Sequence, residues 1–453
     1  METLMKINST VNGIVWGPLI IVLIIGTGTY LSAMTGFFSI TKLGYVLKNT
    51  LFKMFTKEHK GEGEVTAFQA VATALAATVG TGNIAGVATA IALGGPGAVF
   101  WMWLAAVMGM TTKFAEVVLA VNYREKTPDG RFVGGPMYSI TNGLGKNWKW
   151  LGVVFAIFGA LASFGIGCMV QSNSVAFAME GTFGVSPIIT GIILAVITAV
   201  VIIGGIKRIG AFTEKLVPFM AAVYIVGGLW VIIANAGKLP NAFSMIFGQA
   251  FTGTAAVGGF AGSTMMQAVR YGVARGIFSN EAGLGSAPIA HAAATTDHPV
   301  RQGLWGVFEV FMDTIVVCSI TALVILVSGV WDNGQSGAVL SATAFDVGLP
   351  GIGKYIVSVG LILFAYSTII GWEYYGERCV EYLLGTKPIM AYRILWVVAV
   401  VVGSIGGLTF VWDLADTLNA LMAFPNLIGV LMLSPVVFRL TKEFWAMEKD
   451  KAK

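Results

Sequence analysis

The chain has 453 residues, of which 56% are hydrophobic and only 11% are charged, and its mean hydropathy is +0.80. Soluble domains carry about 25% charged residues, so this composition excludes a soluble protein and indicates an integral membrane protein. The net charge of +5 does not indicate a nucleic-acid partner, because the positions of the basic residues follow the alternating loops of a membrane protein.

Apolar runs along the chain predict eleven membrane crossings, because a helix needs roughly 20 apolar residues to cross a bilayer. The first run, from Val15 to Met34, is too long for the core of a signal peptide, so we predict a helix of the mature protein. The crossings are predicted near residues 12–35, 66–92, 95–121, 150–181, 185–206, 213–237, 255–295, 302–330, 353–384, 391–411 and 415–438.

Basic residues separate between alternate loops of this scheme. One set of alternate loops holds most of the 28 basic residues, and Lys113 and Arg378 are counted in this set. The other set holds only Lys6, Lys238 and Lys354. Cytoplasmic loops are enriched in Lys and Arg, so we predict that the N-terminus lies outside the cell membrane and the C-terminus in the cytoplasm.

The ten crossings after the first divide into two groups of five, each of which opens with an interrupted helix. Five is an odd number, so the two groups enter the membrane from opposite sides, as in an inverted-topology repeat. We therefore predict an all-α polytopic membrane protein with four parts. They are an N-terminal helix and cytoplasmic loop (1–65), a first repeat (66–240), a second repeat (241–440) and a cytoplasmic tail (441–453).

The first interruption is rich in Gly, Thr and Asn and lies inside the apolar run from Thr66 to Leu93. Broken backbone at membrane depth is tolerated only where protein or an internal cavity satisfies its polar groups. A broken helix exposes carbonyls that can bind a cation on one side and amides that can bind a carboxylate on the other. We predict substrate contacts at this break from Ala77, Thr78, Gly80, Thr81, Gly82 and Asn83.

The second interruption runs from Gly276 to Pro288 and contains Glu281, which lies near the middle of the membrane. This carboxylate could meet a substrate ammonium, neutralise a cation or tie down the unwound backbone, and the capping character of the segment favours the tie. The segment before it, Ala242 to Gly262, is predicted to be re-entrant or interfacial. Substrate contacts are predicted at Ile277, Phe278, Ser279 and Asn280.

Two other helices carry polar groups that could complete the site. Gly167 and Gln171 are four residues apart and share a helix face, and Ser367 and Thr368 are adjacent hydroxyls four residues before Trp372. Glu309 and Asp313 are also four apart, and they are either a proton relay or a hydrogen-bonded structural pair. The two histidines 291 and 298 are interpreted as packing or surface residues.

Three strings of this sequence resemble the alanine or glycine:cation symporter family of the amino acid-polyamine-organocation superfamily. They are Gly80-Thr-Gly-Asn-Ile-Ala-Gly-Val-Ala88, Gly134-Gly-Pro-Met-Tyr138 and Arg275-Gly-Ile-Phe-Ser-Asn-Glu-Ala-Gly283. The resemblance covers nearly the whole chain. It implies a leucine-transporter-like fold of five plus five helices with one extra N-terminal helix, and uptake of alanine or glycine with sodium or, in some members, protons.

The resemblance also implies site residues. Sodium would be bound by carbonyls of Ala76, Val79 and Phe364 and by the hydroxyls of Ser367 and Thr368, which favours sodium over protons as the coupling ion. The substrate carboxylate would meet the amides near Thr81 and Gly82, and its ammonium would meet the second break or Gln171. An apolar pocket for a methyl side chain would be closed by Phe164, Phe278 and Trp372.

We therefore predict a sodium-coupled symporter of small neutral amino acids that works by alternating access, with no cofactor other than the coupling ion. A proton-coupled transporter is the main alternative. A channel is disfavoured because few charges lie within the membrane, and an enzyme because no catalytic constellation of side chains is present. The predicted partners are the amino acid and the lipid bilayer, and the sequence leaves the oligomeric state open.

Overall fold

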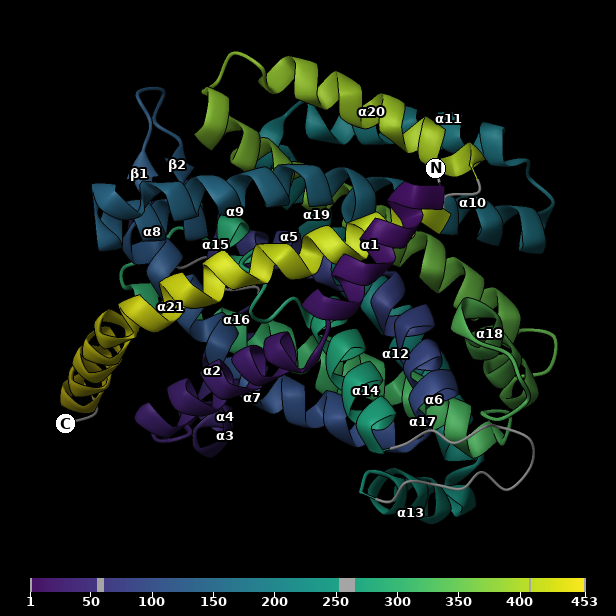
Figure 1. Cartoon of the computed structure of the whole chain (residues 1–453). Helices are drawn as coiled ribbons and strands as arrows, with labels where there is room; N and C mark the ends of the chain where they lie inside the picture. The colour runs from purple at the N-terminus through teal and green to yellow at the C-terminus, as the bar shows by residue number, and fades with distance from the viewer. Residues whose placement is uncertain (1, 55–60, 252–264, 407–408, 452–453) are drawn as a thin grey trace.

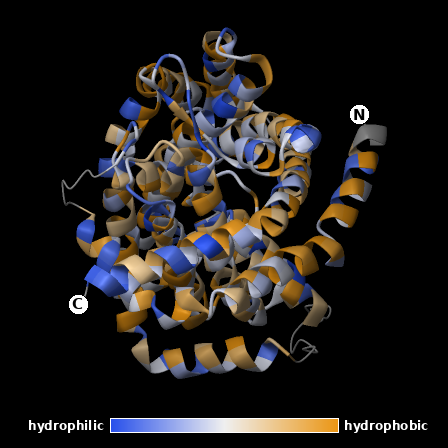
Figure 2. Cartoon of the chain, turned by 90° about the vertical axis from the view of Figure 1, so that its left-hand side faces the viewer, coloured by the Kyte–Doolittle hydropathy of each residue, from blue (hydrophilic) through white to orange (hydrophobic). Residues whose placement is uncertain are grey.

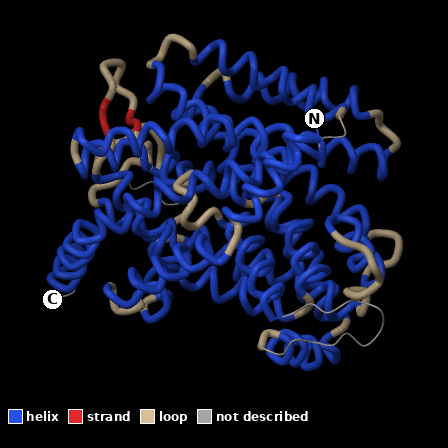
Figure 3. Tube along the Cα trace, in the orientation of Figure 1, coloured by secondary structure: helices blue, strands red, loops and turns tan. Residues whose placement is uncertain are grey.

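A computed structural model of the chain describes residues 2–54, 61–251, 265–406 and 409–451, and these residues are predominantly helical (Figures 1 and 3). The described part contains one pair of short antiparallel strands, β1 (Glu125–Lys126) and β2 (Phe132–Val133), which form a hairpin. In Figure 1 this hairpin and the C-terminus lie at the left and α18 (Gly337–Gly348) lies at the right. We call the side on which the hairpin and the C-terminus lie the hairpin side.

The N-terminal part forms the first predicted crossing. Helices α1 and α2 together give one apolar span from Met5 to Met34, with a turn at Gly17 before Pro18, which starts α2. Proline suits the first position of a helix because an amide hydrogen there has no partner within the helix, so the lack of one costs no hydrogen bond. The elements are α1 (Glu2–Val15), α2 (Pro18–Met34), α3 (Phe38–Thr41), α4 (Leu43–Asn49) and η1 (Leu51–Lys53).

The first repeat begins with a broken helix, as predicted. Its two halves are bent by 50° relative to each other. The elements of this repeat are α5 (Ala67–Thr78), η2 (Gly82–Gly86), α6 (Val87–Gly94), α7 (Gly97–Asn122), α8 (Pro136–Leu144), η3 (Lys146–Trp148), α9 (Lys149–Ala162), η4 (Ser163–Met169), α10 (Val170–Phe183), α11 (Pro187–Ile202) and α12 (Gly205–Ala234). Segments η2 and η4 are π-helical turns within longer helices.

The second repeat also begins with a broken helix, although residues 255–264 of that predicted crossing lie outside the described residues. The predicted interfacial segment is a short helix, α13, as far as the structure describes it. The elements are η5 (Ala236–Lys238), α13 (Leu239–Gln249), α14 (Met265–Asn280), α15 (Pro288–His291), α16 (Pro299–Val310), η6 (Phe311–Cys318), α17 (Ser319–Ser328), α18, α19 (Gly353–Leu384), α20 (Ile389–Ile405) and α21 (Thr409–Lys451).

Seven described helices are long and apolar enough to cross a membrane, and the bent helix formed by α5, η2 and α6 makes an eighth. Helices α11 and α20 are shorter, and they pack against each other at the top of Figure 1. Their outward residues, such as Ile192 and Val398, are exposed and apolar, and Figure 2 shows hydrophobic residues along the surface helices. Such a surface suits contact with lipid, while the full count of eleven crossings stays a prediction.

The two broken helices lie side by side and run in opposite directions. Helix α5 contacts α15, and α6 contacts α14, so the first half of each broken helix meets the second half of the other. Helix α7 packs against both α14 and α16. This antiparallel crossing is what an inverted repeat requires, and it brings the two breaks together inside the bundle.

Backbone pairing closes the hairpin side between the broken helices. Residues 61–65, just before α5, pair with residues 292–296, just after α15, and the amide of Thr295 donates to the carbonyl of Val65 at 2.8 Å. The guanidinium of Arg124 donates to carbonyls of both segments at 2.7 to 3.0 Å. This side therefore stays closed as long as the two segments remain paired.

Two of the basic residues that we assigned to loops are buried inside helices, so that part of the loop assignment was wrong. Lys113 is fully buried in α7 and forms an ion pair with Glu309 of α16. Arg378 is buried in α19 and pairs with Glu377 and Glu381. Each has an acidic partner, which offsets the cost of burying a charge.

Candidate functional site

The first break lies between the end of α5 and the start of η2, and a side chain of η2 holds its backbone. Helix α5 begins with a capping box between Thr66 and Gln69 and ends at Thr78, where Val79 leaves the helical conformation. The side-chain oxygen of Asn83 accepts from the amide of Gly80 at 2.9 Å. Asn83 therefore stabilises the unwound backbone, which is a more structural role than the substrate contact predicted for it.

Helix α19 presents two hydroxyls to the carbonyls that the break frees. Ser367 Oγ lies 3.0 Å from the carbonyl oxygen of Ala76 and 3.4 Å from that of Val79. Thr368 Oγ1 lies 3.2 Å from the Ala76 oxygen, and both hydroxyls are within 3.0 Å of the Phe364 carbonyl. These five residues, which we call the cation cradle, are all buried.

The cradle therefore brings together the five oxygen atoms that we expected to be ligands of sodium. Three are carbonyl oxygens and two are hydroxyl oxygens, so the set carries no formal charge. Hard divalent cations are usually held by carboxylates, whereas unwound carbonyls with hydroxyls suit a monovalent hard cation. The chemistry of the donor set thus fits sodium.

Two glycines in the break allow other segments to approach its backbone. A Cβ atom on Gly80 would lie 2.5 Å from Thr368 Oγ1, and a Cβ atom on Gly82 would lie 3.1 Å from the Cα atom of Ser279. Gly80 therefore adjoins the cradle, and Gly82 adjoins the second break. A side chain at Gly80 would separate the break from α19, so the glycine is required by space.

Two buried polar atoms near this break have no hydrogen-bond partner among the described residues: the hydroxyl of Thr81 and the side-chain oxygen of Gln171. The Gln171 amide nitrogen donates to the carbonyl of Ile166 at 2.9 Å. Its oxygen lies 3.6 Å from the position that a Cβ atom of Gly80 would take. Unpartnered buried polar atoms are costly, so these two are candidates for contact with a polar ligand.

Two of the predicted substrate residues have local or packing contacts instead. The hydroxyl of Thr78 donates to the carbonyl of Ala74 in its own helix at 3.1 Å. Ala77 packs against Gly371 of α19, where an added Cβ atom would lie 2.7 Å from the Ala77 Cβ. These contacts join α5 to α19 and position the break.

Aromatic residues predicted to close one apolar pocket have separate neighbours. Phe164 packs against Tyr392 and Trp396 of α20, with ring centroids 5.2 and 5.4 Å apart. Phe278 reaches the first break, since one of its ring carbons lies 3.2 Å from the Cβ position of Gly82. Phe278 is thus the aromatic residue best placed beside the breaks.

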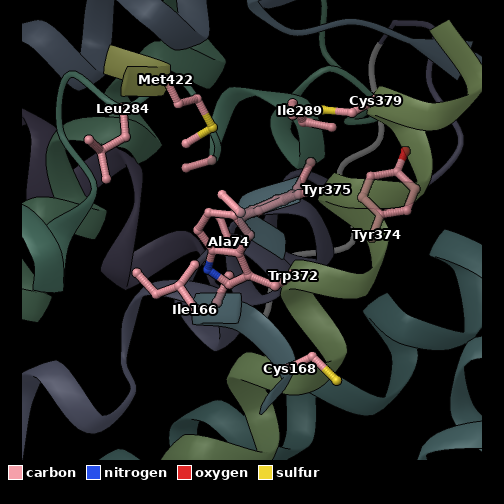
Figure 4. Close-up of a cluster of buried hydrophobic side chains, with 14 of the residues drawn as sticks. Ala74, Ile166, Cys168, Leu284, Ile289, Trp372, Tyr374, Tyr375, Cys379 and Met422 are labelled. Atoms are coloured by element: carbon pink, nitrogen blue, oxygen red, sulfur yellow. The ribbon is translucent and has the colours of Figure 1, made fainter. Parts of the chain in front are cut away.

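Trp372 fills the space that Gly167 leaves open, because a Cβ atom on Gly167 would lie 2.2 Å from the Trp372 Cβ. The gap predicted beside Gln171 is therefore occupied by this indole. Figure 4 shows the ring among Ala74, Ile166 and Tyr375, in a buried cluster that joins α5, η4 and α19. Trp372 packs these elements together around the breaks.

The second break is stabilised by its own polar side chains. Glu281 has a positive φ of 56°, unusual for a non-glycine residue, and its carboxylate accepts from Trp372 Nε1 at 2.8 Å and from Ser286 Oγ at 2.5 Å. Asn280 accepts from the amide of Ala282 and donates to Thr314. The carbonyl of Ile277 accepts from the amide of Glu281. This geometry supports the structural tie among the alternatives for Glu281.

Asp313 links the two breaks directly. Its carboxylate accepts from Asn83 Nδ2 of the first break at 2.6 Å and from Ser279 Oγ of the second at 3.0 Å. Glu309 instead accepts from Lys113 and contacts His291, so the described hydrogen bonds do not join Glu309 to Asp313. The spacing of four residues indicated both carboxylates as candidate functional residues, but it did not predict that Asp313 links the two breaks.

A separate small pocket, with a volume of about 10 Å³, lies beside the second break. Pro136 and Asn426, which line it, both contact Gly285. None of the residues predicted to bind substrate or sodium lines this pocket. The pocket is therefore distinct from the place where the two breaks meet.

Comparison with known proteins gives matches along the whole chain. The model of the sodium:alanine symporter family matches residues 1–453. The chain is 52% identical over 451 residues to the sodium/alanine symporter AgcS of Methanococcus maripaludis, covering 98% of each protein. It is 39% identical over 451 residues to the probable sodium/glutamine symporter GlnT of Bacillus subtilis, covering 99% of this chain and 92% of that protein.

Among solved structures, the crystal structure of MhsT in complex with L-phenylalanine is similar, with a TM-score of 0.61 and 15% sequence identity. The match covers 82% of this chain and 89% of that chain. At this identity the likeness concerns the fold alone, and it confirms the predicted leucine-transporter-like architecture. The matching family and the named relatives are symporters, not enzymes.

Proposed function

Because the chain belongs to the sodium:alanine symporter family, we propose that it imports alanine, glycine or a similarly small neutral amino acid together with sodium. It is a multi-pass membrane protein. The observation that carries the proposal is the cation cradle, in which oxygens freed by the break of one helix meet two hydroxyls of another.

Sodium would bind in the cradle by replacing hydrogen bonds within it. The hydroxyl protons of Ser367 and Thr368 now point to carbonyl oxygens, and a cation between these oxygens would turn the protons away. A bound ion would then hold the first break against α19. The absence of a carboxylate from this donor set favours a monovalent ion over a divalent one.

The amino acid would bind on the other side of Gly80. There the hydroxyl of Thr81 and the side-chain oxygen of Gln171, neither of which has a partner among the described residues, offer a donor and an acceptor for its charged groups. Gly82 packs closely against Ser279 and the ring of Phe278 beside this region, and this close packing supports a small substrate. Backbone amides at the start of the second half-helix favour the substrate carboxylate.

Coupling between ion and substrate would follow from Gly80, which adjoins both regions. Its backbone is in contact with Thr368 of the cradle and lies near Gln171 of the substrate region. An ion that fixes this glycine also fixes the groups that meet the substrate, so each ligand favours the binding of the other. We further propose that the hairpin side faces the cytoplasm, with the N-terminus outside.

Uptake of radiolabelled alanine into proteoliposomes, with and without an inward sodium gradient, tests the proposal. Accumulation above equilibrium that depends on the sodium gradient is expected. Potassium in place of sodium is the matched control for osmotic and surface effects. Gradient-independent flux would indicate a channel, and an equal response to a proton gradient alone would indicate proton coupling. Lack of uptake of every small neutral amino acid would refute the proposed substrate class.

A further inference from the structure

A second polar cluster lies outside the cation cradle and the substrate region. Lys113 Nζ lies 3.2 Å from Glu309 Oε1, and His291 Nε2 lies 3.0 Å from Glu309 Oε2. All three side chains are completely buried, and they come from α7, α16 and α15. Such a buried ion pair persists only when hydrogen bonds satisfy its remaining groups.

His291 has a partner on its other ring nitrogen as well. Its Nδ1 atom lies 2.8 Å from Gln302 Nε2, so the neutral ring donates from Nε2 to Glu309 and accepts at Nδ1 from Gln302. In this arrangement the Gln302 oxygen has no hydrogen-bond partner among the described residues, although it is buried. The amide thus carries an unused acceptor beside the histidine.

This unused acceptor lets the site take a second proton. If a proton binds Nδ1, a half-turn of the Gln302 amide places its oxygen where the nitrogen lay, and the imidazolium then donates from both ring nitrogens. Neither protonation state leaves a ring nitrogen of His291 without a partner. Histidine is the side chain whose ordinary pKa suits such a change near neutral pH.

The charge of the surroundings also permits the second proton. Lys113 and Glu309 cancel each other, so protonation of His291 would leave one positive charge in the triad. Three further buried carboxyl groups lie near the triad, while α5 contributes no titratable side chain. Titratable groups that interact with Lys113 or Glu309 are Glu116 of α7, Glu281 of the second break, Asp313 of η6 and Tyr375 of α19. The guanidinium of Arg124 lies beside the residue that follows His291, where it donates to the carbonyl of Ala292.

We propose that His291 is a proton-binding site of the transport cycle and that a proton on its Nδ1 atom holds the hairpin side closed. His291 ends α15, and the next residues, 292–296, are those that pair with 61–65 and are held by Arg124. The imidazolium ties α15 to α16 by two hydrogen bonds, one of them to a carboxylate, which is stronger than the neutral arrangement. The proton comes from water on the hairpin side and returns there when the segments part.

This inference rests on the proposed transport function, because the closed side must open once in each cycle. Acidification should therefore slow sodium-driven alanine uptake, because the protonated site resists the opening of the hairpin side. The same uptake assay is run between about pH 5.5 and 8 for the wild type and three variants. His291→Gln should lose the dependence, while His298→Gln, which alters a histidine outside the cluster, should keep it.

A third variant, Gln302→Met, keeps the histidine but removes its partner at Nδ1 in both protonation states. It should move the pH dependence of uptake to lower pH, because the hydrogen bond lost from the charged imidazolium is stronger than the one lost from the neutral ring. Uptake that is equally pH-dependent in the wild type and in His291→Gln would overturn the proposal. If His291→Gln does not fold, an unmoved pH dependence in Gln302→Met overturns it instead. Absence of sodium-driven uptake in the wild type would count against the transport function, which is a separate result.

Discussion

Removing both hydroxyls of the cation cradle, by Ser367→Ala together with Thr368→Val, should weaken sodium binding strongly while leaving the helix bundle intact. Each substitution deletes one of five oxygen donors, and an interaction with a charged group contributes about 1.5 kcal/mol. Since about 1.4 kcal/mol is a tenfold change in affinity, each single variant should raise the half-saturating sodium concentration about tenfold. The double variant should raise it by more, although adjacent residues need not be additive.

The structure also ranks the two single variants. Ser367 Oγ reaches the carbonyls of both Ala76 and Val79, whereas Thr368 Oγ1 reaches only that of Ala76 across the break. Ser367→Ala should therefore have the larger effect on sodium affinity. Ser358→Ala is the matched control. It removes a hydroxyl from the same helix, and among the described residues this hydroxyl bonds to Thr182, at 2.7 Å, outside the cradle.

Two assays read this prediction independently. The first is the sodium dependence of alanine uptake in proteoliposomes, and the second is the rise in melting temperature of the purified protein as sodium is added. Both should shift together in the cradle variants and stay at wild-type values in the control. A double variant that folds normally and keeps the wild-type sodium dependence would refute the cradle as the ion site.

Gly80→Ala should abolish sodium-driven uptake in a protein that still folds, because the added methyl group would lie 2.5 Å from a cradle hydroxyl. The control Gly86→Ala should transport normally, because its added methyl group would meet no neighbouring atom within 4 Å. Equal activity of the two variants would contradict the reasoning. Trp372→Phe leaves a carboxylate oxygen of Glu281 without its donor, so we expect a stability loss of about 1 to 3 kcal/mol, measured by denaturation, and no loss would argue against the tie. Arg124→Gln removes three bonds to backbone carbonyls, so hydrogen exchange in the two segments that it clamps should accelerate, and unchanged exchange would show that the clamp is not needed for closure.

The breaks and the cradle could be predicted from the sequence because their signals are local. A run of Gly, Thr and Asn at membrane depth interrupts a helix whatever packs around it, and its backbone groups must then find hydrogen-bond partners elsewhere in the protein. The adjacent hydroxyls of Ser367 and Thr368 lie on a helix that is otherwise apolar near the middle of the membrane. The family resemblance then joined these two features, and the structure brings their oxygens together.

The partners of the buried charges could not be predicted in this way. Glu309 and Asp313 are four residues apart, which on a regular α-helix places them on one face and favours a shared role. A π-helical segment begins at Phe311, between them, and its wider turn changes the direction in which Asp313 points. Glu309 consequently meets Lys113 and His291, while Asp313 meets the two breaks.

The sequence by itself determined that this is a membrane protein of two inverted halves, each with a broken helix, because composition, hydrophobic length and helix-breaking residues act locally along the chain. Only the tertiary structure decided which polar groups meet. It placed Lys113, counted with the loops, inside α7. Beside Gly80 it left the hydroxyl of Thr81 and the side-chain oxygen of Gln171 without a partner among the described residues. The physical reason is that hydrogen bonds between helices depend on which faces are turned together, and that is fixed by packing across the whole bundle.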